Sequence, residues 1–187
     1  MVSLSPPVCD FGWSAPDFAL PGVDGRTHSL ASCRGPAGLL VMFICNHCPY
    51  VKAILPRLLR DCRELAGLGV GSVALMANDP ADYPEDSWEA MQRIAVEQDF
   101  PFPYLLDASQ DVARAYGAVC TPDFFGFNRD LKLQYRGRLD ASGRQPAPSD
   151  TRRELFEAMA QVARSGEGPR DQTASIGCSI KWRPSAP

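Results

Sequence analysis

The segment from Leu39 to Tyr50 constrains the fold of this chain more than any other stretch. Its five consecutive apolar residues at 40–44 predict a buried parallel strand. Cys45-Asn46-His47-Cys48 follows directly, and Pro49 suits the first turn of a helix because a missing N–H costs nothing there. Apolar residues then recur at helical spacing as far as Leu65. The pattern therefore places two cysteines, separated by two residues, where a core strand passes into a helix.

The position of this cysteine pair indicates thiol chemistry. Unpaired N–H groups and the positive end of the helix dipole favour an anion at a helix N-terminus. A cysteine there can have a pKa well below the free value of about 8.5, and the thiolate is the reactive form. We predict that Cys45 provides this thiolate and that Cys45 is the exposed member of the pair.

Length and composition exclude several classes of protein. The 187 residues, 45% of them hydrophobic, predict a single domain over 1–187 with an ample core. A net charge of −3 without a basic stripe predicts no nucleic-acid partner. No apolar run approaches the roughly 18 residues of a membrane span, and the N-terminal residues lack the features of a signal peptide. We therefore expect no membrane partner and a cytoplasmic location.

The seven cysteines are odd in number, which argues against a structural disulfide framework in an unsecreted chain. Redox or catalytic thiols fit this number better. Cys62 belongs to the apolar stripe of the first long helix, where we expect it to be a small buried hydrophobe. Cys9 and Cys33 lie in expected loop and hairpin segments, and we assign them no role.

The remaining pattern predicts a mixed sheet with helices on both faces. Residues 1–14 are expected to be loosely ordered, and a turn at Val23-Asp24-Gly25 predicts a hairpin over 18–30. Thr151, with Glu154 three residues later in a capping box, predicts the start of the last helix. The other expected elements are helices at 49–66, 87–99 and 107–117, strands at 70–76 and 102–106, and an antiparallel pair at 123–127 and 131–135.

Several segments carry a resemblance to a known family. The strand–CxxC–helix unit at 45–48 resembles the thioredoxin superfamily, and Thr121-Pro122 is similar to the cis-proline dipeptide of that superfamily. With CTPDFF at 120–125 and SIGCSIKW at 175–182, the chain resembles bacterial peroxiredoxin-like (AhpC/TSA-like, redoxin) proteins that carry CxxC. The resemblance implies a thioredoxin-like three-layer α/β/α fold with a mixed central sheet, an N-terminal β-hairpin and an inserted helix.

The resemblance also implies a thiol–disulfide oxidoreductase, in which Cys45 attacks a disulfide and Cys48 resolves the mixed disulfide. A protonated His47 would favour a thiolate, and we expect it to make the pair more oxidising. The expected partners are a disulfide-containing protein or small-molecule substrate and an unidentified reductant, with no cofactor. A zinc site would need two further ligands, but the chain has no second CxxC and only one other histidine, His28. We therefore expect no metal.

In the resembled fold, the Thr121-Pro122 loop faces the cysteine pair. The Thr121 backbone can pair with an extended substrate, and Pro122 keeps the loop from donating a hydrogen bond or drawing in a metal. Cys120 directly precedes this dipeptide. It is either an accessory redox thiol near the active site or a buried cysteine at a strand edge.

Two other functions are compatible with this fold. A peroxiredoxin-like thiol peroxidase, an antioxidant protein, uses Pro-x-x-x-Thr/Ser-x-x-Cys and a distant arginine. Alignment on Cys48 puts Val41 and Cys45 at the proline and hydroxyl positions, and alignment on Cys45 fails as well. Arg138 is expected to be a strand-end charge rather than the missing arginine. The second alternative is a non-catalytic adaptor, although such a protein need not keep both cysteines and His47.

The C-terminal segment 166–187 is not composed like a disordered end. Residues 176–182 include two isoleucines, a tryptophan and a cysteine, whereas disordered tails are poor in such residues. We expect this extension to dock on the domain. Docking would bring Cys178 near another thiol, with Cys120 as the first choice and the CxxC pair as the second. The alternative is that the tail only covers an apolar patch.

Overall fold

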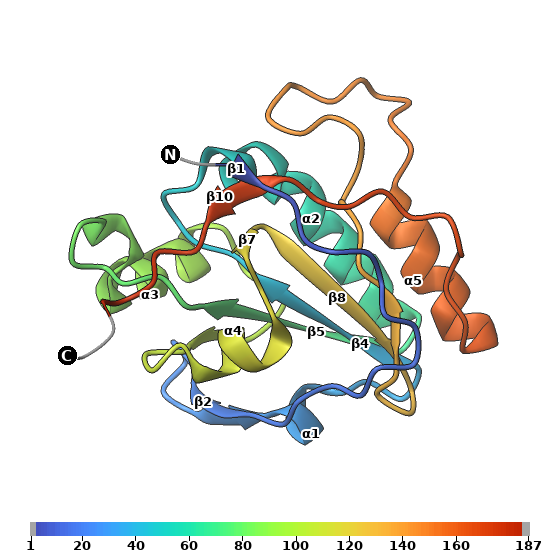
Figure 1. Cartoon of the computed structure of the whole chain (residues 1–187), viewed down its shortest axis with the longest axis horizontal. Helices are drawn as coiled ribbons and strands as arrows, with labels where there is room; N and C mark the ends of the chain where they lie inside the picture. Colours follow the sequence, from blue (N-terminus) through green and yellow to red (C-terminus); the bar gives the residue numbers. More distant parts are fainter. Residues whose placement is uncertain (1–2, 185–187) are drawn as a thin grey trace.

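The computed structural model describes residues 3–184 of the chain. Its main sheet has the strand order β6-β5-β4-β8-β9 (Figure 1). β5 runs parallel to β4 and to β6, whereas β8 runs antiparallel to both of its neighbours, so the predicted mixed sheet is confirmed. The strands are β4 (Gly38–Phe43), β5 (Val70–Met76), β6 (Tyr104–Leu106), β8 (Asp123–Asn128) and β9 (Leu133–Tyr135).

The central position of β4 follows from its composition. All six residues of the strand are buried, and their side chains alternate between two hydrophobic clusters. Leu40 and Met42 belong to one cluster, and Leu39 and Val41 belong to the other. A continuous apolar run is typical of a strand that is covered on both faces.

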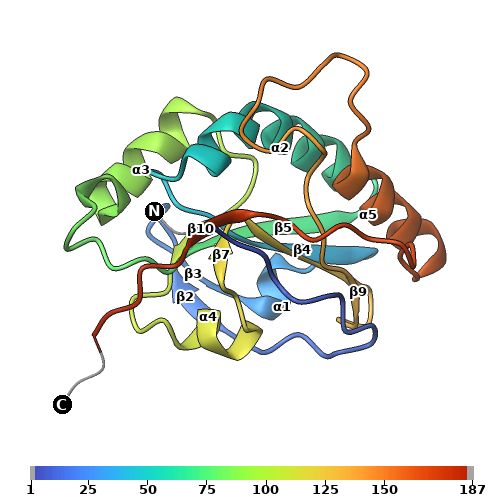
Figure 2. The ribbon, with the colours of Figure 1, turned by 45° about the horizontal axis from the view of Figure 1, so that its top comes forward.

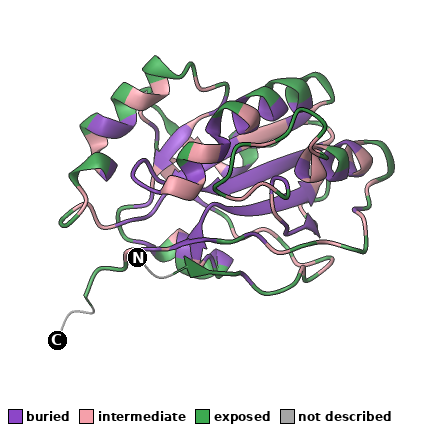
Figure 3. Cartoon of the chain, turned by 90° about the horizontal axis from the view of Figure 1, so that it is seen from above, coloured by how far each residue is buried: buried purple, intermediate pink, exposed green. Residues whose placement is uncertain are grey.

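Helices cover each face of the main sheet (Figure 2). One face carries α2, α3 and α5, and the other carries α1 and α4, so the predicted three-layer α/β/α arrangement is confirmed. Figure 3 shows that the strands of the main sheet are mostly buried and that the outer sides of the helices are exposed. None of the helices in the described part of the chain is both long enough and apolar enough to span a membrane. The helices are α1 (Leu30–Cys33), α2 (Pro49–Gly67), the 3₁₀ helix η1 (Pro84–Asp86), α3 (Trp88–Glu97), α4 (Asp111–Tyr116) and α5 (Glu154–Ser165).

The last helix begins later than the sequence predicts. It starts at Glu154 rather than at Thr151, and Arg153 precedes it without a capping side-chain hydrogen bond. The Leu155 N–H in the first turn donates instead to the carbonyl of Leu139 at 3.1 Å. A loop carbonyl therefore satisfies one of the first N–H groups of the helix, which have no partner within the helix.

The predicted N-terminal hairpin is present as two short antiparallel strands beside the main sheet. These strands are β2 (Ala19–Pro21) and β3 (Thr27–Ser29). The hairpin is followed directly by α1, where the Ser29 hydroxyl accepts a hydrogen bond from the Ser32 N–H at 3.2 Å. A side-chain cap of this kind stabilises even a helix of one turn.

A separate three-stranded sheet joins the two ends of the described chain. Its strands are β1 (Ser3–Leu4), β7 (Cys120–Thr121) and β10 (Gly177–Ser179). β10 lies between the other two and runs antiparallel to both (Figure 1). The prediction of a loosely ordered 1–14 segment is therefore wrong from residue 3 onward, because β1 pairs with β10 and Trp13 packs on Tyr116 with ring centroids 5.8 Å apart. Residues 1 and 2, and 185–187 of the tail, lie outside the described residues.

Candidate active site at the end of the central strand

The CxxC segment lies between the end of β4 and the first turn of α2. The Ile44 N–H still donates to the Leu75 carbonyl of β5 at 3.1 Å, so the sheet holds the chain up to the residue before Cys45. The helix begins at Pro49, and Cys48 is its N-cap residue. The cysteine at the helix N-terminus is therefore Cys48, and the prediction that Cys45 holds this position is wrong.

Both cysteines are buried. Cys45 is 1% exposed and Cys48 is 0% exposed, so the expectation of an exposed Cys45 is also wrong. Thr121 covers the pair, because its hydroxyl lies 3.3 Å from the Cys45 sulfur and its carbonyl lies 3.1 Å from the Cys48 sulfur. β10 in turn pairs with the strand that contains Thr121. A substrate sulfur can therefore reach the pair only when a covering segment moves.

The surroundings of the two sulfurs favour the negative charge on Cys48. A hydrogen bond to Cys48, together with burial and the nearby Asp86 carboxylate, raises the pKa of Cys45 well above its usual value. The same hydrogen bond lowers the pKa of Cys48, and burial opposes this effect. The Val51 N–H in the first turn of α2 lowers the pKa of Cys48 further, and the Thr121 hydroxyl lowers the pKa of both cysteines. The Thr121 carbonyl accepts a hydrogen bond from the Cys48 thiol and so opposes loss of its proton. The other contacts of Cys48 outweigh this effect.

Asp86 is the central residue of the site that the sequence did not identify. Its side chain is fully buried at the end of η1. One carboxylate oxygen accepts from the N–H groups of Asn46 at 2.8 Å and His47 at 3.2 Å. The other accepts from His47 Nδ1 at 2.6 Å and from the Asn78 amide at 2.8 Å. These contacts fix the CxxC loop to the segment that follows β5.

His47 is positioned by Asp86 more closely than by the cysteines. Its Nδ1 lies 2.6 Å from the Asp86 carboxylate and 3.8 Å from the Cys45 sulfur. The imidazole stacks on Tyr83 with ring centroids 4.2 Å apart, and its buried Nε2 has no hydrogen-bond partner among residues 3–184. The imidazole therefore lies closer to the Asp86 carboxylate than to the Cys45 sulfur, and its predicted effect on the sulfurs stays a prediction.

Cys45, His47 and Asp86 are also the residues that could hold a metal ion, because their ligand atoms lie within 4.8 Å of one another. The geometry is that of a hydrogen-bonded network. Two ligands of one tetrahedral zinc ion lie about 3.3 Å or more apart, given metal–ligand distances of about 2.0–2.2 Å. The distance of 2.6 Å between His47 and Asp86 is shorter, so a metal ion would require this pair to separate.

The structure brings Thr121 and Pro122 to the cysteine pair and turns Cys120 away from it. The Thr121–Pro122 peptide bond is cis, as the resemblance implies. Successive side chains of a strand point to opposite faces, so Cys120 faces away from the side on which Thr121 contacts Cys45. The Cys120 sulfur lies 3.5 Å from the Pro122 carbonyl, and burial raises the pKa of Cys120 to about 12.

Cys178 lies next to the CxxC pair. It is opposite Thr121 in the antiparallel ladder, and its thiol is close enough to the Cys48 thiol for the two to shift each other's pKa. Burial raises the pKa of Cys178 to about 12. The structure thus places Cys178 beside its second predicted partner. Cys120, the first choice, lies one position along β7 and faces the opposite side of the ladder.

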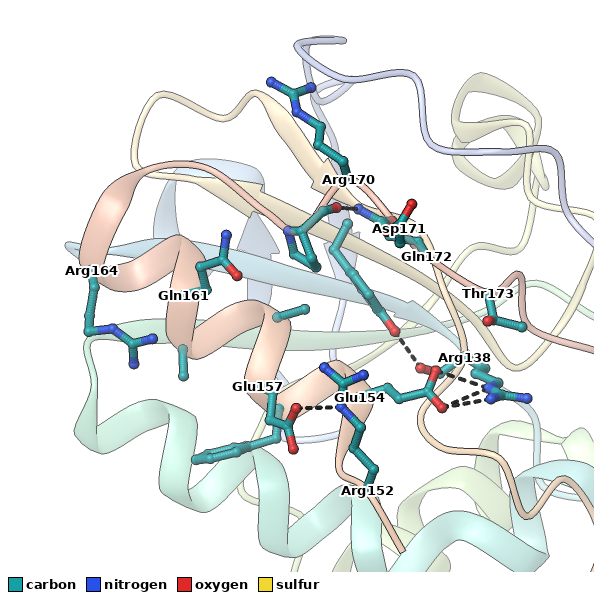
Figure 4. Close-up of a pocket in the computed structure, with 15 residues that line it drawn as sticks. Arg138, Arg152, Glu154, Glu157, Gln161, Arg164, Arg170, Asp171, Gln172 and Thr173 are labelled. Atoms are coloured by element: carbon teal, nitrogen blue, oxygen red, sulfur yellow. Dashed lines mark hydrogen bonds and ion pairs between the residues drawn. The ribbon is translucent and has the colours of Figure 1, made fainter.

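Two pockets lie near these segments, and only one of them borders the site. The first has a volume of about 100 Å³, and its lining includes Tyr50, Pro122 and Ile176. The second has a volume of about 800 Å³ and lies between α5 and the segment 169–173 (Figure 4). Among the described residues, neither lining contains a cysteine, and Arg138, which lines both pockets, is bound to Glu154 at 2.7 Å. Arg138 therefore acts as a paired structural charge, as expected.

Comparison with known proteins shows the family. The chain belongs to the AhpC/TSA family, whose family model matches residues 11–136. Thioredoxin-like structures at 20% and 22% identity, with TM-scores of 0.62 and 0.63, have the same fold. The protein is therefore a redoxin of the thioredoxin superfamily, and both the resemblance and the predicted thioredoxin-like fold are confirmed.

Individual relatives extend this similarity over the whole chain. An uncharacterized conserved protein from Geobacillus kaustophilus is 44% identical with a TM-score of 0.93, and the alignment covers 100% of this chain and 99% of that one. The hypothetical protein SMc02350 from Sinorhizobium meliloti 1021 is 37% identical with a TM-score of 0.90, over 97% and 99% of the two chains. The thiol-disulfide oxidoreductase ResA of Geobacillus thermodenitrificans (strain NG80-2) is 26% identical over 130 residues, which span 66% of each chain.

Proposed function

We propose that this protein is a thiol–disulfide oxidoreductase that cycles Cys45 and Cys48 between dithiol and disulfide. The observation that carries the proposal is the hydrogen-bonded contact of these two sulfurs at the N-terminus of α2, beneath Thr121. The AhpC/TSA family and the similarity to ResA support oxidoreductase chemistry in general. The assignment to these residues rests on the geometry of the site.

The reaction takes place in two exchange steps. A cysteine thiolate attacks the substrate disulfide, a mixed disulfide forms, and one substrate sulfur leaves as a thiolate that takes up a proton. The second cysteine attacks the mixed disulfide and releases the other substrate thiol. The protein loses two electrons and the substrate gains two. A separate reductant, a dithiol or glutathione-type thiol, then returns the protein to its dithiol form.

The surroundings of the sulfurs favour Cys48 as the attacking thiolate and Cys45 as the resolving thiol. Cys48 caps α2, whereas Asp86 disfavours a negative charge on Cys45. This order is the reverse of the one that the sequence suggests. The Cys45 thiol already contacts Cys48, so resolution requires little movement.

The surroundings of the pair favour a small disulfide or an extended peptide segment as substrate. The pocket of about 100 Å³ beside Pro122 has room for only a small group. A larger protein substrate would have to displace β10 from the Thr121 edge, because β10 occupies the backbone hydrogen bonds there.

Turnover of a simple disulfide tests the proposal. The reduced protein should reduce glutathione disulfide or an aromatic disulfide reagent catalytically, with a dithiol as the electron source. Cys48→Ser should abolish turnover, and Cys45→Ser should lower it, because the Cys45–Cys48 disulfide can no longer form. The matched control is Cys62→Ser, which alters a buried cysteine of α2 whose sulfur contacts Met42 in the core. A fully reduced, folded protein without turnover would favour the adaptor.

A further inference from the structure

The C-terminal segment is fixed against the active site by contacts on both sides of β10. Before the strand, the Ser175 hydroxyl donates to the Pro122 carbonyl at 2.7 Å. After the strand, the Lys181 N–H donates to the Asn78 side chain at 2.9 Å. Asn78 also donates to Asp86, so the segment shares a network with the CxxC loop. These contacts hold the cysteine between them in one place.

Gly177 allows this segment to approach closely. A Cβ atom on Gly177 would lie 2.1 Å from the Thr121 carbonyl oxygen, a distance that no side chain tolerates. The lack of a side chain therefore lets β10 lie on the edge of β7. Cys178 is the next residue, and it is 2% exposed.

The register of the ladder decides which way Cys178 faces. It lies opposite Thr121, so the two side chains share one face. On that face the Thr121 hydroxyl lies 3.3 Å from the Cys45 sulfur. Cys178 is therefore on the side of β7 that faces the CxxC pair, and the Cys48 and Cys178 thiols are close enough to shift each other's pKa. The Cys48 sulfur thus has two neighbouring thiols, Cys45 and Cys178.

We propose that Cys178 is a third redox cysteine, which resolves disulfides formed on Cys48 in competition with Cys45. The inference rests on the proposed function, because it requires Cys48 to form a mixed disulfide. A thiol held within hydrogen-bond reach of the sulfur that it attacks needs little reorganisation. The same contact lets the tail store the oxidised state as an internal disulfide.

The proposed step is balanced within the protein and its substrate. The Cys178 sulfur attacks the Cys48 sulfur of the mixed disulfide, the bond from Cys48 to the substrate sulfur breaks, and the Cys48–Cys178 disulfide forms. The departing substrate thiolate takes the proton that Cys178 loses. Cys45 can then attack Cys48 and replace Cys178, with no net oxidation or reduction. This exchange equilibrates the two internal disulfides.

Disulfide mapping of the full chain tests the inference. The reduced protein is equilibrated in glutathione redox buffers, quenched with acid, alkylated, digested and analysed by mass spectrometry. We expect the wild type to contain both Cys45–Cys48 and Cys48–Cys178. Cys45→Ser should form Cys48–Cys178, and Cys178→Ser should form only Cys45–Cys48. Cys120→Ser is the matched control on the neighbouring strand and should keep both disulfides.

A second pair of variants separates docking of the tail from the presence of the thiol. Gly177→Ala should lower the yield of Cys48–Cys178 at least tenfold and leave Cys45–Cys48 intact. Gly67→Ala, at a position where a Cβ meets nothing within 4 Å, is its control and should change neither. Two results together would refute the inference and leave the proposed function. The wild type would form Cys45–Cys48 but no Cys48–Cys178 disulfide at any potential, and Cys45→Ser would form no internal disulfide. Absence of Cys45–Cys48 in the wild type would refute the proposed function itself.

Discussion

Replacing Asp86 with asparagine perturbs the site without changing its shape. The carbonyl oxygen of the introduced asparagine can still accept from the backbone N–H groups of residues 46 and 47, which both donate to one oxygen of Asp86. The other oxygen becomes an NH₂ group. This group would face His47 Nδ1 and the Asn78 amide, which both donate to Asp86 in the wild type. Two hydrogen bonds are therefore replaced by contacts between donors.

The size of the effect follows from these contacts. A hydrogen bond to a charged group contributes about 1.5–3 kcal/mol, so the loss of two should lower the free energy of unfolding by about 3–6 kcal/mol. Loss of one partner from a buried charge pair costs a similar amount. The negative charge of Asp86 also helps to raise the pKa of Cys45, so this pKa should fall in Asp86→Asn.

Two measurements on the reduced protein check both effects. Urea denaturation gives the free energy of unfolding, and the pH dependence of Cys45 alkylation, followed by mass spectrometry, gives the change in its pKa. The control is Asp61→Asn, which removes another buried carboxylate, paired with Arg153 at 2.6 Å. Asp61 lies about 18 Å along α2 from Pro49, so this variant should lose stability without changing Cys45. A loss below about 1 kcal/mol in Asp86→Asn, or an unchanged Cys45 profile, would refute the reasoning.

Further predictions concern the thiols, His47 and a second buried carboxylate. Alkylation of Cys48 should be nearly independent of pH between about 6 and 9, because its thiolate is already formed there. Cys9, whose pKa burial raises to about 11, should react faster as the pH rises. If mass spectrometry shows faster labelling of Cys45 than of Cys48, the opposite order of attack is correct. His47→Ala should shift the reduction potential by less than about 30 mV in glutathione buffers, because the imidazole lies closer to the Asp86 carboxylate than to the Cys45 sulfur, and a larger fall would contradict this. Burial raises the pKa of Asp123 to about 6, so the folded state binds the proton of this carboxyl group more tightly than the unfolded state does. The free energy of unfolding should therefore fall by up to about 3 kcal/mol as the pH rises from about 4 to 6. Asp123→Asn should lack that loss in urea titrations. Hydrogen peroxide should be consumed slowly, and rapid consumption abolished by Cys48→Ser would favour a peroxidase.

The elements with long, clear periodicity could be predicted from the sequence. The strand at 70–76 has the predicted bounds, and the helix predicted at 49–66 is Pro49–Gly67. The strands of the small sheet could not be predicted, because segments of two or three residues have no measurable period. Their pairing is also a contact between the two ends of the chain, which only the folded main sheet brings together.

The site could be predicted only in part, for a different reason. The motif located the sulfurs, but their reactivity depends on residues that lie far away in sequence. The segment 79–86 contains four acidic residues, and nothing in their order distinguishes Asp86 from the other three. The prediction also assigned the helix N-terminus to Cys45, although Pro49 marks the first turn and Cys48 is the residue next to it.

The burial of both sulfurs links their reactivity to the position of the tail. The tail is held by separate hydrogen bonds, each contributing about 0.5–1.5 kcal/mol net, and segments held in this way can open without unfolding of the domain. Cys178 lies in the strand that covers Thr121, and its contact with Cys48 persists only while that strand is docked. A Cys48–Cys178 disulfide would hold the strand closed, and its reduction would allow the strand to open. Access to Cys48 and the oxidation state of Cys178 are therefore coupled through the same three residues of β10.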